Sequence, residues 1–146
     1  MFRGNHPTRV DEKGRLKVPA DFKRLLDERH SNQFYITSRD GRVAEVYPMD
    51  EWQRIEEKLA KVSNFNEAKK KFLARTNYYG QVVEIDAQGR VLLPSLLRES
   101  ADLKGEVAVL GNLTYLEVRN MEAFRKEMQE NPFTADDAKT LDELGI

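Results

Sequence analysis

A ten-residue segment of this chain occurs twice, and the repeat constrains every other interpretation of the sequence. The segment VDEKGRLKVP, with Asp11 and Pro19, returns as IDAQGRVLLP, with Asp86 and Pro94, 75 residues later. A second pair of segments, VYPMDEW and VRNMEAF, is offset by 72 residues. Both matches together indicate an internally duplicated chain. Because each copy has only about 45 residues, we expect the copies to pack against each other or to oligomerise.

Both copies of the segment carry the residues of a tight β-hairpin turn. Asp11 stands at the first turn position and Gly14 where the backbone needs a positive φ, which is typical of a type I turn closed by a G1 bulge. Asp86 and Gly89 hold the same places in the second copy. An aspartate at this position accepts hydrogen bonds from backbone N–H groups two residues on. We therefore predict structural roles for these four residues.

The rest of each copy predicts a short helix, two strands and a longer helix. Pro19 and Pro94 mark the starts of the short helices, since proline is tolerated where the first helical N–H has no partner. Turn signals at residues 39–41 and 111–112 each join two strands into a hairpin. The four predicted strands cover residues 33–37, 43–47, 107–110 and 115–118.

Two helices are predicted between the copies. Trp52, Ile55, Leu59 and Val62 recur at helical spacing and predict one buried helix face. The segment NFNEAKKKFLARTNYYG follows and predicts a bridging helix, with an apolar face and a basic face. The apolar face comprises Phe65, Ala68 and Phe72, and the basic face comprises Lys69, Lys70, Lys71 and Arg75. A solvated linker is the simpler explanation of the basic face.

The last segment, residues 131–146, is acidic. It predicts a helix that docks on a neighbour, with four acidic residues around three apolar ones. The acidic residues are Asp136, Asp137, Asp142 and Glu143, and the apolar residues are Leu141, Leu144 and Ile146.

The composition excludes several classes of protein. The chain has no cysteine, no run near the roughly 18 apolar residues of a membrane-spanning helix, and no apolar signal region in its start MFRGNHPTRVD. We therefore expect a cytoplasmic protein with no membrane partner. His6 and His30 have no neighbour at metal-ligand spacing and are predicted to be surface residues. An enzyme is not indicated, and we expect no metal, no cofactor and no small-molecule substrate.

Charge is distributed unevenly along the chain. Residues 1–80 hold 17 Lys or Arg against 12 Asp or Glu, whereas residues 81–146 hold 7 against 13. A basic half beside an acidic half favours a polyanionic partner on one face, although charge runs are also common on plain solvated surfaces.

The first hairpin carries the chemistry of a DNA-binding ribbon. Alternation along a strand places Arg15 and Lys17 on one face, with Lys13 at the tip of the turn. A two-stranded ribbon fits the major groove of DNA, where arginine bonds to guanine and lysine meets phosphates. The second copy has Gln88 and Leu92 in place of the two lysines. The predicted DNA-binding residues are Arg3, Arg9, Lys13, Arg15 and Lys17.

Arg15 and Arg90 also have a structural explanation. Each arginine is placed to pair across its own turn, Arg15 with Asp11 and Arg90 with Asp86, as a device that both copies share. Both roles stay open for Arg15. The structural role is favoured for Arg90, because its copy lacks the lysines at the tip.

These segments also resemble a known family. The start MFRG, the motif DEKGRLKVP, its second copy DAQGRVLLP and the Trp52 helix are similar to the MraZ family of bacterial transcriptional regulators, over residues 1 to about 128. The resemblance implies an α+β, mainly β fold of two tandem swapped-hairpin AbrB-like half-barrel domains, packed as a pseudo-symmetric pair with bridging helices. The family's Asp and Arg of the two turns fall on Asp11 and Arg15 and on Asp86 and Arg90.

The resemblance divides the chain into four parts. We expect a first, DNA-reading AbrB-like domain at residues 5–50, bridging helices at 51–78, a second AbrB-like domain at 79–122, and a C-terminal helix with an acidic tail at 123–146.

The resemblance also implies how the protein works. It implies a ring-shaped homo-oligomer that lies on the nucleoid, binds short direct repeats in the promoter of its own division and cell-wall gene cluster, and represses that cluster. The alternative is a protein-binding module such as an AbrB-like antitoxin. Antitoxins usually pair one hairpin domain with a disordered toxin-binding tail, whereas this chain duplicates the domain and leaves only about fifteen residues after it.

Overall fold

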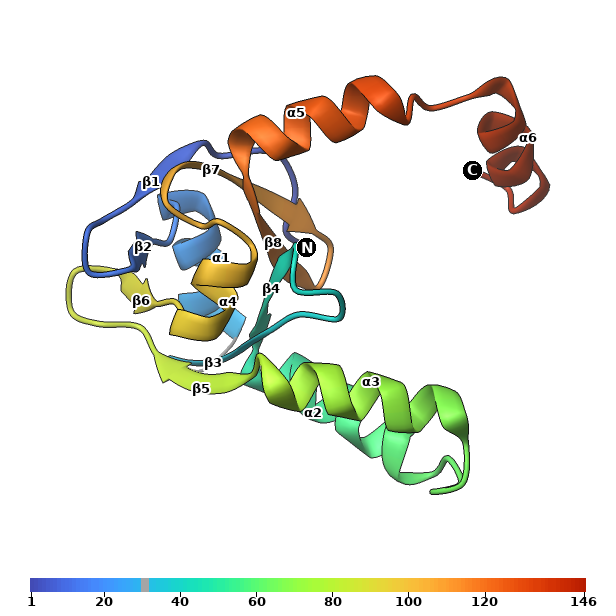
Figure 1. The fold of residues 1–146 in the computed structure, drawn as a ribbon, viewed down its shortest axis with the longest axis horizontal. Coiled ribbons are helices and arrows are strands. Elements are labelled where there is room, and N and C mark those ends of the chain that lie inside the picture. Colours follow the sequence, from blue (N-terminus) through green and yellow to red (C-terminus); the bar gives the residue numbers. More distant parts are fainter. Residues whose placement is uncertain (30–31) are drawn as a thin grey trace.

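The fold is one eight-stranded antiparallel sheet that curls into a nearly closed barrel (Figure 1). The computed structural model describes residues 1–29 and 32–146, so His30 lies outside the described residues. The first copy contributes β1 (Thr8–Val10), β2 (Arg15–Lys17), α1 (Ala20–Arg29), β3 (Gln33–Thr37), β4 (Ala44–Pro48), α2 (Met49–Ala60) and α3 (Glu67–Tyr78). The second contributes β5 (Gln81–Glu84), β6 (Arg90–Leu92), α4 (Ser95–Ser100), β7 (Gly105–Asn112), β8 (Tyr115–Asn120), α5 (Met121–Glu130) and α6 (Ala135–Glu143). The predicted order of elements is confirmed in both copies.

The two copies exchange strands within this sheet. The strand order is β5-β3-β4-β8-β7-β1-β2-β6, so the first hairpin strand of each copy pairs with the other copy. β1 pairs with β7, and β5 pairs with β3. If each strand is replaced by its counterpart in the other copy, β1 by β5, β2 by β6, β3 by β7 and β4 by β8, the order of neighbours around the barrel stays the same. The fold is therefore a pseudo-symmetric pair of swapped-hairpin half-barrels, as the resemblance implied.

The core lies inside the barrel and under the two short helices. Leu16 and Val91, directly opposite each other on β2 and β6, are buried against it. α1 buries Phe22 and Leu26, and α4 buries Leu97. Because both hairpins contribute to one core, neither half has a complete core of its own, which agrees with the small size of each copy.

The helices between the copies pack through aromatic rings. Trp52 of α2 is 4% exposed, and its ring stacks on those of Tyr35 and Phe72 at centroid distances of 4.7 and 6.1 Å. The prediction that Val62 continues this buried face is wrong, because α2 ends at Ala60 and Val62 is 38% exposed in the following turn.

The predicted faces of the bridging helix also need correction. Phe65 precedes α3 and is 85% exposed. Lys69, assigned to the basic face, is buried, because its ammonium group donates hydrogen bonds to the Val62 carbonyl and the Asn64 side chain. Lys69 therefore closes the turn between α2 and α3 rather than presenting its charge to solvent.

The turn between β7 and β8 lies two residues later than predicted. Gly111 and Asn112 are the last residues of β7, and the turn is formed by Leu113, with φ of +62°, and Thr114. A Cβ on Gly111 would lie 2.2 Å from the backbone nitrogen of Arg3. The glycine is thus needed for close approach of the N-terminal segment, which pairs with this end of β7, rather than for a turn.

Candidate nucleic-acid interface

The first hairpin turn is held by one carboxylate. Asp11 accepts hydrogen bonds from the backbone N–H groups of Lys13 and Arg15 at 3.0 and 2.8 Å, and from Nε of Arg15 at 2.7 Å. Gly14 has φ of +82° and donates its N–H to the Asp11 carbonyl. The predicted turn is confirmed, and so is the structural pairing of Arg15 with Asp11.

The second turn repeats this geometry with one difference. Asp86 accepts from the backbone N–H groups of Gln88 and Arg90 at 2.8 and 2.9 Å, and Gly89 has φ of +78°. Among the described residues the Arg90 guanidinium has no hydrogen bond to Asp86 and instead lies 4.0 Å from the Asp11 carboxylate. The predicted ion pair of Arg90 with Asp86 is therefore not formed, because the strand exchange brings the Asp11 carboxylate closer, although the Arg90 charge still helps to lower the pKa of Asp86.

Backbone hydrogen bonds hold the carboxylates of both turns in their charged form. The N–H of Arg15 is the main cause that lowers the pKa of Asp11, and the N–H of Arg90 does the same for Asp86. Both carboxylates therefore stay ionised further into the acid range than a free aspartate and brace the turns.

The two turns lie side by side at one end of the barrel, away from α3 and α6 (Figure 1). The backbone N–H of Val18 bonds to the Gly89 carbonyl at 2.9 Å, and that of Leu93 bonds to the Gly14 carbonyl at 3.0 Å. These reciprocal bonds join each turn to the strand of the other copy.

The β2–β6 pair has one buried and one outer face. Arg15 lies opposite Leu92, and Lys17 lies opposite Arg90. Side chains directly opposite in an antiparallel pair share a face, so these four residues form the outer face, with Leu16 and Val91 beneath it. We call this the paired-hairpin face.

A residue that sequence reasoning missed supports the tip of the first turn. Arg98 of α4 donates from Nη1 to the Lys13 carbonyl at 3.0 Å, and a Cβ on Gly14 would lie 1.2 Å from the same nitrogen. In the other turn, Lys23 of α1 passes Gly89 at 3.6 Å from that glycine's Cβ position. Lys23 and Arg98 are 75 residues apart, which is the offset of the repeat. This spacing was the signal in the sequence that could have identified them as equivalent residues.

Arg3 is not brought to the first hairpin turn, whereas Arg9 lies beside it. The register that pairs Val10 with Leu16 places Arg9 next to Lys17 on the exposed face, and Arg9 lines a groove that also contains Arg98. Arg3 lines a separate hollow beside α1 with His6. The His6 ring is half-buried, 4.6 Å from the ring of Phe22, so it is less exposed than predicted. Of the predicted set, Arg3 lies apart, and Arg9, Lys13, Arg15 and Lys17 belong to the first hairpin.

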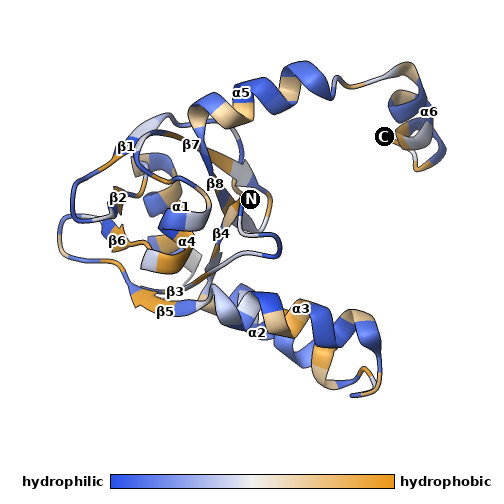
Figure 2. Cartoon of the chain, viewed as in Figure 1, coloured by the Kyte–Doolittle hydropathy of each residue, from blue (hydrophilic) through white to orange (hydrophobic). Residues whose placement is uncertain are grey.

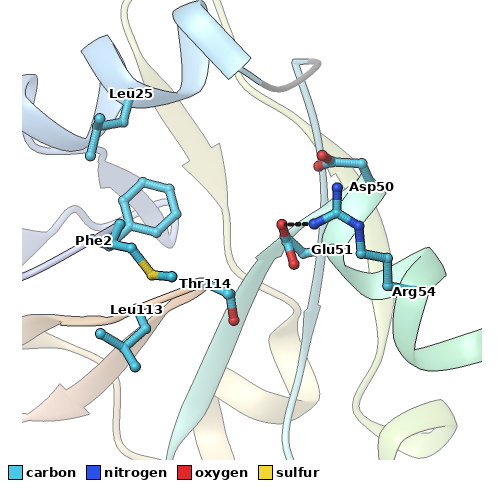
Figure 3. Close-up of a pocket in the computed structure, with 8 residues that line it drawn as sticks. Phe2, Leu25, Asp50, Glu51, Arg54, Leu113 and Thr114 are labelled. Carbon is cyan, nitrogen blue, oxygen red and sulfur yellow. Dashed lines mark hydrogen bonds and ion pairs between the residues drawn. The ribbon is translucent and has the colours of Figure 1, made fainter. Parts of the chain in front are cut away.

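The surface of the barrel also carries hollows away from the paired-hairpin face. One, of about 230 Å³, has Phe2, Leu25 and Leu113 on one side and Arg54, paired with Glu51, on the other (Figure 3). Within residues 1–29 and 32–146, no three His, Cys, Asp or Glu side chains are grouped to hold a metal ion. Among these residues no helix is long and apolar enough to cross a membrane.

Comparison with known proteins identifies the family. The model of the family described as "MraZ protein, putative antitoxin-like" matches residues 1–75 and 80–144. The chain belongs to the MraZ family. A "Transcriptional regulator MraZ" from Acidobacterium capsulatum is 64% identical over the full length of both chains. Proteins of the same name from Koribacter versatilis and Hydrogenovibrio crunogenus are 60% and 34% identical, with 100% of this chain covered in both.

These comparisons place this MraZ-family chain among transcriptional regulators. The matched residues fall in both copies and include both turns and the swapped strands. The names of the relatives support a regulator of transcription and give no indication of a catalytic family.

Proposed function

We propose that this protein is a sequence-specific transcriptional regulator that binds double-stranded DNA through the paired-hairpin face. The observation that carries the proposal is the register of β2 and β6, which places Arg15, Lys17 and Arg90 on one outer face. Lys13 and Arg98 stand at the adjoining tip of the first turn. Five cations at one end of the barrel form the electrostatic footprint expected of a DNA-binding surface.

The shape of this end suits the major groove. The groove admits a two-stranded ribbon, in which arginine can bond to guanine O6 and N7 and lysine can meet phosphates. Arg15 is already oriented by the carboxylate of Asp11, so less conformational freedom is lost when it binds. The structural pairing of Arg15 and its proposed base contact are therefore compatible.

The two copies contribute unequally. Lys13 and Lys17 of the first hairpin correspond to Gln88 and Leu92 of the second. Leu92 is 55% exposed on the paired-hairpin face, where a lysine at the equivalent position would face DNA. The first hairpin is thus the stronger candidate for DNA contact, and the second supports it.

The proposal extends to assembly and target by family resemblance. Several copies in a ring-shaped homo-oligomer would present several first hairpins to consecutive direct repeats, and their contacts would add through effective concentration. The target we propose is the promoter of the protein's own division and cell-wall gene cluster, with repression as the result. This role would place the protein in the cytoplasm, on the nucleoid.

The decisive experiment converts the first hairpin into the second. In the variant Lys13→Gln/Lys17→Leu, each residue is replaced by its counterpart from the other copy, so both fit a turn and strand of this fold. Fluorescence anisotropy would compare the parent protein with this variant. Each would be titrated with the DNA fragment upstream of the protein's own gene and with a fragment of shuffled sequence, at several salt concentrations. We expect weaker binding, with the slope of log affinity against log salt reduced by about 2, one for each lost phosphate contact.

The control is the matched change on the second hairpin, Gln88→Ala, which should leave affinity unchanged. Loss of one guanine contact in Arg15→Ala should cost about 1–3 kcal/mol for each engaged hairpin. Light scattering must show that each variant keeps the mass of the parent protein. Equal affinity of the parent for native and shuffled fragments would contradict sequence-specific regulation and favour a nonspecific or protein-binding role.

A further inference from the structure

The two copies differ in the placement of the helix that ends each of them. In the first copy α3 folds back on α2, with the ring of Phe72 6.1 Å from that of Trp52. At the 72-residue offset of the repeat, Trp52 corresponds to Phe124, and α6 takes the place of α3 in the order of elements. No residue of α6 is buried, and the partner over the ring of Phe124 is instead the Arg119 guanidinium, at 5.1 Å. The second copy thus has a counterpart of α3 that does not fold back on the helix before it.

The segment left free is residues 131–146, which we call the C-terminal arm. α5 leads away from the barrel and α6 lies beyond it, apart from the sheet (Figure 1). No residue of α6 is buried, yet the helix is well specified, since Thr134 and Asp137 form a capping box at its start. The capping box defines where this nine-residue helix starts, and no packing against the barrel stabilises it, so the helix can gain stability by packing against another molecule.

The arm combines exposed apolar side chains with unpaired negative charge. Phe133, Leu144 and Ile146 are 70%, 71% and 78% exposed. Figure 2 shows apolar positions on α6 although no other element covers the helix. Asp142 and Glu143 beside them form no ion pair within the part of the chain that the structure describes. A partner surface must therefore supply both an apolar patch and cations.

The α2–α3 hairpin presents such a surface. At its tip Phe65 is 85% exposed and Val62 38% exposed. Along α3, Lys71 and Arg75 are one turn apart, exposed, and without an ion pair among the described residues. Lys70 beside them pairs, among the residues that the structure describes, only with Glu67, at 3.4 Å. We call Val62, Phe65, Lys70, Lys71 and Arg75 the hairpin patch.

We propose that the C-terminal arm of one copy of this protein docks on the hairpin patch of a second copy. Exposed apolar residues would meet at Leu144 and Phe65, and Asp142 and Glu143 would lie against the lysines of α3. The C-terminal arm and the hairpin patch are different surfaces of the same chain, so the contact is head-to-tail. An open row of copies would keep one unoccupied arm at one end and one unoccupied patch at the other. A head-to-tail contact of this kind forms a closed ring when its rotation closes. The inference rests on the proposed homo-oligomer and names the surfaces that would build it.

The first test is the mass of arm variants in light scattering. Phe133→Ser/Leu144→Ser alters only exposed side chains, so the monomer should fold, as circular dichroism would check. We expect this variant to fall from the mass of the oligomer to that of the monomer. Leu96→Ser on α4, where the leucine is 49% exposed outside both surfaces, should keep the parent mass. If the arm variant kept the mass of the oligomer, the arm contact would be wrong but the proposed homo-oligomer would not be affected. If the parent protein were a monomer, both the arm contact and the homo-oligomer would be wrong.

Charge reversal then tests the partner surface. Asp142→Lys/Glu143→Lys and Lys70→Glu/Lys71→Glu should each lower the mass when purified alone, and an equimolar mixture of the two should recover assembly between the reversed arm and the reversed patch. Failure of the mixture to associate, with both variants folded, would show that these charges do not face each other.

Crosslinking gives the geometry. Because the chain contains no cysteine, Phe65→Cys and Leu144→Cys each introduce a single thiol. A flexible thiol-reactive crosslinker should join the two variants when they are mixed and should join neither variant to itself. Crosslinks of either variant only with itself would contradict the head-to-tail contact.

Discussion

The guanidinium of Arg98 donates a hydrogen bond of 3.0 Å to the backbone carbonyl of Lys13, across the boundary between the two copies of the repeat. Arg98 belongs to the short helix of the second copy, and Lys13 stands at the tip of the hairpin proposed to bind DNA. The first hairpin is therefore positioned in part by the second copy. This relationship gives the less basic copy a function even where it contributes fewer contacts to DNA.

Removal of that support should weaken DNA binding. We expect Arg98→Ala to lower affinity roughly two- to tenfold, the value of one net hydrogen bond of about 0.5–1.5 kcal/mol, as measured by anisotropy. The matched control is Lys23→Ala at the equivalent position of the other copy, which should change affinity little because it faces the second turn. If both variants lost DNA affinity to a similar extent, the cause would be the removal of a positive charge and not the loss of the hydrogen bond to Lys13.

The two turn glycines should differ in their tolerance of a side chain. Both have positive φ, so alanine at Gly89 should cost roughly 1–2 kcal/mol of unfolding free energy for the left-handed backbone alone. Alanine at Gly14 also displaces the guanidinium end of the Arg98 side chain, so we expect in addition the loss of its hydrogen bond to Lys13, about 0.5–1.5 kcal/mol. Urea denaturation would measure both. In the Gly14→Ala background, Arg98→Ala should therefore cost no further stability, and a full additional loss would rule out displacement of Arg98 as the cause.

The aromatic cluster outside the barrel should dominate the stability of the helical hairpin. Trp52→Ala removes a buried ring that contacts Tyr35, Tyr47 and Phe72, and we expect a loss of about 3–5 kcal/mol in thermal or urea unfolding. Phe124→Ala, at the equivalent position, loses mainly the contact with Arg119 and should cost about 1 kcal/mol. Equal losses would mean that the fold-back of α3 adds no stability.

The turn aspartates should make the protein sensitive to acid. The pKa values of Asp11 and Asp86 are lowered from the ordinary value of 3.8 in the folded chain. Their stabilisation is therefore fully present above about pH 4 and is lost as pH falls through the lowered pKa values. A series of melting temperatures between pH 7 and pH 2 should show a steeper decline for the parent protein than for Asp86→Asn. Parallel declines would contradict a role of this carboxylate.

Local signals predicted the hairpin turns correctly and failed where distant segments intervened. Asp11 and Gly14 act within five residues of chain, so their pattern was sufficient to predict the turn. Gly111 has the same chemistry, yet it serves the approach of Arg3, which comes from the other end of the sequence. Lys69 was assigned to a solvated face by its spacing and is buried because the turn before α3 offers it two acceptors.

The sequence by itself determined the duplication, the order of elements in each copy, the two turns and the basic character of the first hairpin, because these depend on neighbours along the chain. Only the tertiary structure decided which residues meet at the paired-hairpin face. The copies exchange strands, so Arg90 approaches Asp11 and Arg98 reaches Lys13, although each pair is more than 75 residues apart. The physical reason is that neither copy is large enough to bury its own core, so the core and the proposed binding surface are both built from two halves.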